Sequence, residues 1–108
     1  AATWLLRGEA HPGFEALSEI GAQADGEAAR VALNAMATWD GRASLSLLTM
    51  PSLIIWGDED RSYRWRQVEY LWTHLPAASL AVIPGASHAA HVEKPELFRM
   101  ILEDFLTG

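Results

Sequence analysis

Residues 53–60 read Leu53-Ile54-Ile55-Trp56-Gly57-Asp58-Glu59-Asp60, and they indicate the architecture of this chain more clearly than any other segment. Its apolar first half predicts a strand that is covered on both faces, as in a parallel sheet. A second apolar run, Leu80-Ala81-Val82-Ile83, predicts another strand, and Pro84-Gly85-Ala86-Ser87-His88 follows it as a turn. The first turn therefore presents carboxylates and the second a histidine, which are two of the three groups in a nucleophile–His–acid triad.

Helical patterns follow both predicted strands. After the first strand, apolar residues recur at helical spacing up to Pro76, namely at Trp65, Val68, Leu71, Trp72 and Leu75. After the second strand, Pro95 suits the first turn of a last helix, whose apolar positions are Leu97, Phe98, Ile101, Leu102, Phe105 and Leu106. The order strand, helix, strand, helix predicts a right-handed crossover and the α/β fold class.

Residues 1–50 are rich in alanine and predict helices. Asp25 is a suitable N-cap, and an apolar stripe follows it at Ala28, Val31, Ala32, Ala35 and Trp39. Asp40-Gly41 ends that helix, and His11-Pro12-Gly13 divides the segment 2–20 into two weaker helical pieces. We therefore expect a helical segment over residues 1–50 and an α/β portion over residues 51–108.

Composition excludes several classes of function. The formal net charge of −6 argues against a nucleic-acid partner, and no apolar run approaches the ~20 residues of a membrane span. The chain has no cysteine, which excludes disulfides and thiolate metal ligands. No basic-then-apolar leader is visible at the amino end, so we expect a cytoplasmic protein.

The ordered motifs of residues 51–108 resemble the C-terminal part of the α/β-hydrolase family. They are Pro51, the turn Gly57–Asp60, the turn Gly85–His88, and Glu93-Lys94-Pro95. The resemblance implies a mainly parallel sheet, with residues 1–50 compatible with the end of a helical cap and the helix after it. Two strands are marginal as a sheet, so we expect either the missing N-terminal part of the same fold or a homo-oligomer partner to supply neighbouring strands.

The resemblance also assigns the catalytic roles. It makes Asp60, three residues after Gly57, the acid that orients the histidine, and it makes His88 the general base. Asp58 stays open as an alternative acid, because the loop Arg61–Arg64 stands where the family often has a proline. The simpler interpretations are a solvated turn for Asp60 and an ordinary loop position for His88.

No convincing nucleophile occurs in the sequence. The pentapeptide Gly-x-Ser-x-Gly that usually carries it is absent. Ser87 lies in a superficially similar sequence, but it directly precedes His88, which disfavours it as the nucleophile. We therefore expect a chain that is inactive by itself and belongs to an enzyme hydrolysing a small-molecule ester or related bond. Alternatives are a non-catalytic module of the same fold that binds a ligand or protein, and a strand-exchanging small α/β domain.

Metal and cofactor sites are not expected. His88, His91 and Glu93 are three possible ligands. Helical zinc-binding motifs place two histidines four residues apart on one helix face, whereas these two are three residues apart in a predicted loop. We expect Glu93 before or at the first turn of the last helix, where a carboxylate interacts favourably with the helix dipole. His11 and His74 are expected at the surface.

The five tryptophans predict extensive aromatic packing. Four of them are expected in the core or between helices: Trp4, Trp39, Trp65 and Trp72. The fifth, Trp56, lies near the end of its predicted strand that carries the acids. Trp56 could therefore border a pocket instead.

Overall fold

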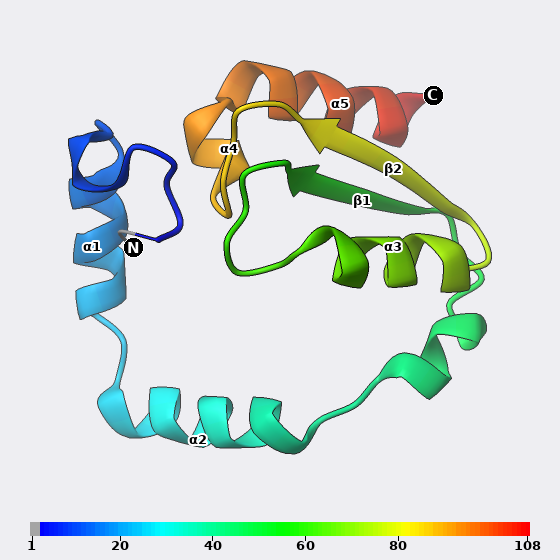
Figure 1. Cartoon of the computed structure of the whole chain (residues 1–108), viewed down its shortest axis with the longest axis horizontal. Coiled ribbons are helices and arrows are strands. Elements are labelled where there is room, and N and C mark those ends of the chain that lie inside the picture. The colour runs from blue at the N-terminus through cyan, green and yellow to red at the C-terminus, as the bar shows by residue number, and fades with distance from the viewer. Residues whose placement is uncertain (1–2) are drawn as a thin grey trace.

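The computed structural model describes residues 3–108, which form helices around a small parallel sheet (Figure 1). The order of elements confirms the predicted α/β fold, and only the first residue of the expected helical piece 2–20 lies outside the described residues. The elements are η1 (Gly8–Ala10), α1 (Phe14–Ala22), α2 (Gly26–Thr38), η2 (Arg42–Leu47), β1 (Ser52–Gly57), α3 (Trp65–His74), β2 (Ala78–Ile83), α4 (Ala90–Glu93) and α5 (Pro95–Thr107). None of the described helices has the length and apolar character needed to cross a lipid bilayer.

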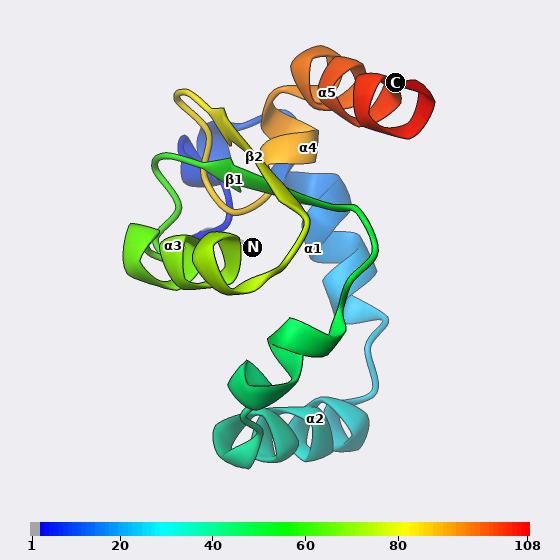
Figure 2. The same ribbon diagram turned by 90° about the vertical axis from the view of Figure 1, so that its right-hand side faces the viewer.

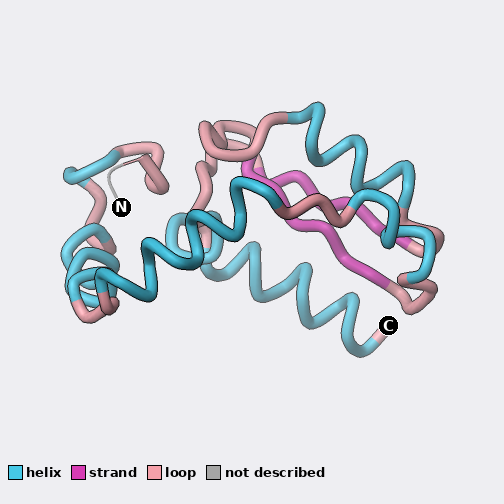
Figure 3. Tube along the Cα trace, turned by 90° about the horizontal axis from the view of Figure 1, so that it is seen from below, coloured by secondary structure: helices cyan, strands magenta, loops and turns pink. Residues whose placement is uncertain are grey.

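The sheet consists of β1 and β2, which pair in parallel from Ser52 opposite Ala78 to Gly57 opposite Ile83. Helix α3 connects them on one side of the sheet, and α5 lies on the other side (Figure 2). The same sandwich of strands between helices is visible from below (Figure 3). Both strands end at one edge of the sheet, so the turns that follow them are neighbours.

Helix α2 begins where the sequence predicts it. The Asp25 side chain accepts a hydrogen bond from the backbone N–H of Ala28 at 2.8 Å, which is an N-cap contact. The apolar stripe of this helix, however, is exposed rather than packed, and α2 buries no residue. The helix lies apart from the sheet in Figure 1, so its stripe has no opposing layer within the described residues.

The prediction that four tryptophans are buried in the core or between helices is wrong, because all four are exposed. Their exposed fractions are 44% for Trp4, 78% for Trp39, 42% for Trp65 and 45% for Trp72. The reason is a shortage of covering chain: the radius of gyration is 15.5 Å, against about 13 Å for a compact domain of this length. Helical spacing correctly places Trp65 and Trp72 next to each other on α3 (Trp65–His74), but the described residues supply no layer to bury them.

The buried core is small and lies beside the histidine turn. Ile83, Ala86 and Ala90 form its centre. Partly buried apolar side chains from β1 and α5 pack against it, namely Ile55, Phe98 and Ile101. The best-packed part of the chain therefore holds the residues that precede and follow His88.

Candidate active site

The acid turn and the histidine turn are interlocked through their backbones. The N–H of Glu59 donates to the carbonyl of Ala86 at 2.9 Å. A Cβ atom added to Gly57 would lie 2.3 Å from the Ala86 oxygen and 2.4 Å from the Ser87 oxygen. Glycine is required at position 57, because no larger residue permits the two backbones to approach this closely.

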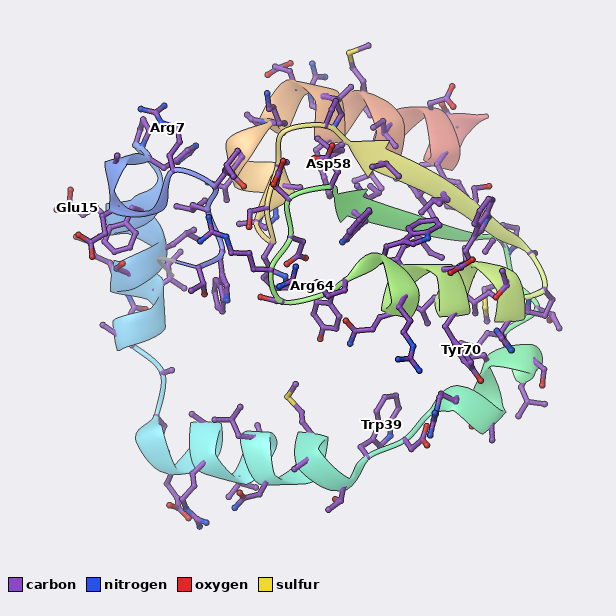
Figure 4. The ribbon with its side chains drawn as sticks, in the orientation of Figure 1. Arg7, Glu15, Trp39, Asp58, Arg64 and Tyr70 are labelled. Carbon is purple, nitrogen blue, oxygen red and sulfur yellow. The ribbon has the colours of Figure 1, made fainter. Side chains whose placement is uncertain are left out.

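Asp58 joins the two turns but does not meet the histidine. Its Oδ1 accepts a hydrogen bond from the N–H of Gly85 at 2.8 Å. Gly85 has a φ of +64°, in the left-handed region that glycine adopts without strain. Figure 4 shows Asp58 beyond the carboxyl end of the strands. The sequence leaves both Asp58 and Asp60 open as the acid. This contact gives Asp58 a structural role, because it stabilises the histidine turn.

Asp60 is buried and its carboxylate is held by three donors. Oδ1 accepts from the backbone N–H groups of Ser62 at 2.7 Å and Tyr63 at 3.2 Å. Oδ2 lies 3.1 Å from Nδ1 of His88. The Asp60 side chain is 5% exposed, whereas that of His88 is 32% exposed. The loop thus aims one oxygen at the histidine and shields the pair from water on the acid side.

Two aromatic rings border the imidazole of His88. The Tyr63 ring is stacked at a centroid distance of 5.6 Å and an interplanar angle of 17°. The Trp4 ring lies at 5.5 Å and is tilted by 52°. When the Nδ1–H group of the neutral ring donates a hydrogen bond to Asp60, Nε2 carries no proton and can accept one. The arrangement can therefore remove a proton from a group placed next to Nε2.

A cavity of about 390 Å³ opens beside this pair and lies along β1 and α3. Its lining is mainly apolar and aromatic, and it includes Asp60, His88, Trp56, His91 and Phe98. Trp56 thus borders a pocket, and its Nε1 donates to the backbone carbonyl of Tyr63 at 2.9 Å. Among residues 3–108, no serine, threonine or cysteine lines the cavity.

Ser87 lies away from this cavity although it is the neighbour of His88. It is 1% exposed, and its Oγ contacts the carbonyl oxygen of Thr3 at 3.4 Å. Its backbone N–H donates to Glu93. A buried hydroxyl turned toward the N-terminal segment cannot reach a substrate beside His88, which agrees with the sequence argument against Ser87.

Glu93 differs from the sequence expectation. It lies before α5, as predicted, but the segment read as a loop forms the short helix α4, which Glu93 ends. Its carboxylate does not serve the dipole of α5. It accepts hydrogen bonds from the backbone N–H groups of Ser87, at 2.7 Å, and Leu6, at 2.8 Å.

The other histidines do not join the site as metal ligands. The His91 ring packs against Phe98 at 5.8 Å, and His74 stacks on Tyr70 at the surface, at 3.8 Å. The half-buried His11 accepts from the N–H of Gly13 through Nδ1. Among residues 3–108, no group of three His, Cys, Asp or Glu side chains could hold a metal ion.

Sequence reasoning missed three residues around His88. The Trp4 ring lies beside His88 although the two residues are far apart in the sequence. Glu93 contacts Ser87, which is six positions away, and Leu6, which is 87 positions away, and no local pattern signals the long-range contacts. Tyr63 follows Asp60 by three positions, and an aromatic residue in the loop after a candidate acid was a usable signal.

We compared the chain with known proteins by sequence and by structure. No protein-family model matches the chain. A provisionally named carbamate hydrolase, RutD, from Pseudomonas savastanoi pv. phaseolicola is 34% identical over 76 residues, which are 70% of this chain and 29% of that protein. The chain therefore spans less than a third of the length of this curated relative.

Solved structures agree with the sequence comparison. MGS-M2, an alpha/beta hydrolase enzyme from a Medee basin deep-sea metagenome library, is 32% identical with a TM-score of 0.61, over 64% of this chain and 25% of that one. A 2-hydroxy-6-oxo-6-phenylhexa-2,4-dienoate hydrolase from Rhodococcus sp. strain RHA1 has a TM-score of 0.74 at 22% identity, over 98% of this chain and 41% of that one. The chain belongs to the α/β-hydrolase fold family, of which it carries the C-terminal part.

Proposed function

We propose that this chain supplies the acid and the base of a hydrolase that cleaves a small-molecule ester or related bond. Asp60 is the acid and His88 the general base. The observation that carries this proposal is the contact of 3.1 Å between Asp60 Oδ2 and His88 Nδ1, at the shared end of two parallel strands. A buried carboxylate on Nδ1 selects the tautomer in which Nε2 is free to act.

The proposed chemistry follows from that tautomer. Nε2 of His88 takes a proton from the attacking nucleophile or from water, and it later returns the proton to the leaving group. Asp60 stabilises the imidazolium that exists between these two steps. We place the nucleophile outside these residues, because no serine, threonine or cysteine of residues 3–108 lines the cavity.

The open side of the sheet is the proposed place of the missing part. Within residues 3–108, β1 pairs with β2 alone, and the cavity extends along β1 past Ile54 and Ile55. A further parallel strand on this side would end at the same edge as Asp60 and could carry a nucleophile toward His88. We propose the N-terminal part of the same fold as its source, with a second copy of the chain as the alternative.

The substrate class is proposed from the cavity and the relative together. The cavity lining is mainly apolar and aromatic, which favours an uncharged small molecule over a charged one. The relative RutD is named as a carbamate hydrolase, and a carbamate has an acyl carbon like that of an ester. We therefore propose small esters and carbamates as the first substrates to test.

The test measures turnover of p-nitrophenyl esters and carbamates by the intact natural protein that carries this chain. We expect His88→Ala and Asp60→Asn each to lower kcat by roughly 10⁴-fold, since the loss of either group leaves only binding and oxyanion stabilisation. Matched controls are His74→Ala and Glu59→Gln. They change the same kinds of side chain at exposed positions. Glu59 takes part in the acid turn through its backbone N–H, which the substitution keeps, so we expect turnover to stay within about twofold.

Two results would contradict the proposal. One is undiminished turnover in both His88→Ala and Asp60→Asn. The other is robust hydrolysis by the 108-residue chain alone, abolished by Ser87→Ala, which would make Ser87 the nucleophile. Saturable binding of the same compounds without turnover would favour the non-catalytic binding module.

A further inference from the structure

The carboxylate of Glu93 connects two segments that are far apart in the sequence. Oε1 accepts from the N–H of Ser87 at 2.7 Å, and Oε2 accepts from the N–H of Leu6 at 2.8 Å. The second contact spans 87 positions. Each oxygen thus has its own backbone donor, and the side chain is partly buried where the two segments meet.

Residues Thr3–Leu6, which we call the N-terminal strap, lie against the histidine turn. The carbonyl of Trp4 accepts from the N–H of Ala89 at 2.8 Å. Leu5 is fully buried, which anchors the strap by an apolar contact as well. The strap also brings the Trp4 ring to 5.5 Å from the His88 imidazole.

The two residues that flank His88 are therefore both held by their backbone N–H groups. Glu93 holds Ser87 directly, and the strap holds Ala89 through Trp4. Because Glu93 also holds the strap at Leu6, one carboxylate contributes to the restraint on each side of the histidine. A histidine fixed on both sides presents its imidazole in one direction.

We propose that Glu93 is a positioning residue for His88. It touches no substrate, and it acts by fixing the backbone from which the imidazole extends and the aromatic ring beside it. The inference rests on the proposed function only in so far as His88 is the base of the reaction. The orientation itself is a property of the folded chain and can be measured without turnover.

The geometry explains why a carboxylate is needed at position 93. Here each N–H meets a different oxygen of the same side chain, and only an ionised acid offers an acceptor at both positions of one planar group. A glutamine has the same shape, but its NH₂ group would face one of the two donors. Glu93→Gln therefore removes one of the two contacts without creating a cavity.

The experiment measures the tautomer of His88 in the intact natural protein by NMR of ¹⁵N-labelled histidine, with the signal assigned through His88→Gln. In the unmodified protein we expect the Nδ1–H form, because Nδ1 faces Asp60. In Glu93→Gln we expect a partial loss of that form and a weaker contact signal between the Trp4 and His88 rings. Glu93→Ala removes both oxygens, and there we expect a larger loss of both signals.

Glu96→Gln is the matched control. Glu96 lies three positions later in the first turn of α5, where its 80% exposed carboxylate pairs with Arg99. We expect no change in the His88 signal for this variant. A change as large as that in Glu93→Gln would overturn the proposal, because general charge removal would then explain both. An unchanged tautomer in folded Glu93→Gln would overturn it too, and so would failure of this variant to fold, since the role of Glu93 would then be global stability.

Kinetics separate this inference from the proposed function. A misplaced base costs about tenfold to 10²-fold in rate, so we expect Glu93→Gln to lower kcat by that factor while KM stays within about twofold. A tenfold to 10²-fold rise in KM with unchanged kcat would contradict a positioning role. If His88→Ala leaves turnover intact but Glu93→Gln still shifts the tautomer, the proposed function fails and the positioning of His88 by Glu93 stands.

Discussion

Gly57 controls how closely the acid and histidine turns approach. A methyl group at this position would overlap two backbone oxygens, those of Ala86 and Ser87, and backbone atoms cannot move aside as a flexible side chain can. We expect Gly57→Ala to lower the free energy of unfolding by about 1–3 kcal/mol. Urea denaturation of the intact protein, followed by tryptophan fluorescence, measures the change.

Gly21→Ala is the control for this prediction. Gly21 lies in α1, and a Cβ atom there would meet nothing within 4 Å. Alanine lowers the entropy of the unfolded chain and favours helix, so we expect a gain of about 0.4–1 kcal/mol. Equal stability of Gly57→Ala and the unmodified protein would show that the two turns are not held at this distance in solution.

The residues of the candidate site fall into two groups, those that local sequence patterns locate and those that reach the site through contacts distant in sequence. The sequence predicts the geometry of Asp60 and His88, because each follows an apolar strand and parallel strands bring their ends together. It does not predict Trp4 or Glu93. Trp4 is far from His88 in the sequence, and Leu6 lies 87 positions from Glu93. Both partners of Glu93 are backbone donors, the N–H groups of Leu6 and Ser87, and a backbone donor leaves no trace in the identity of the residue.

Among the elements, α2 is the one in which an N-cap can be expected to contribute most to helix stability, because this helix packs poorly. Helix α2 buries no side chain, so its order depends mainly on its own backbone and on the N-cap Asp25. We expect Asp25→Ala to destabilise the helix by about 1 kcal/mol. Hydrogen exchange of the amides of α2 should then speed up roughly fivefold, while α5 exchanges as before.

Asp25→Asn serves as the control for the cap. Asparagine offers an equivalent acceptor oxygen and is equally favoured at the N-cap, so we expect exchange close to that of the unmodified protein. If Asp25→Ala leaves the exchange of α2 unchanged, the helix is held by a partner surface rather than by its cap.

The elements themselves were predictable because their signals are local. Apolar periodicity located α3, α5 and both strands, and the cap residue located the start of α2. The short helix α4 was missed because four residues are too few to show a helical period. The packing of α2 was also mispredicted, since an apolar stripe indicates a face that favours burial but not whether a partner layer is present.

At the scale of the whole molecule, the chain exposes surfaces that a compact domain would cover. One edge of β1 has no partner strand within residues 3–108, and large apolar side chains are exposed on α2 and α3. Open strand edges favour pairing with another chain. We therefore expect the purified 108-residue chain to associate or aggregate rather than to remain a compact monomer.

Sedimentation over a range of concentrations checks this expectation. A rising average mass supports it, and addition of the N-terminal part of the same fold should restore a single species if that part is the natural neighbour. A single monomeric species with cooperative unfolding and strongly protected amides along β1 would contradict it, because residues 1–50 would then cover the open edge.

The contact between the strap and Glu93 also sets an order of events during synthesis. Leu6 leaves the ribosome 87 residues before its partner does. At ~5–20 residues per second that interval lasts roughly 4–17 s, far longer than a helix needs to form. Helices α1 and α2 can therefore form while the strap is still unpaired. The surroundings of His88 are completed only after the C-terminal segment arrives, so the candidate site is among the last parts of this chain to assemble.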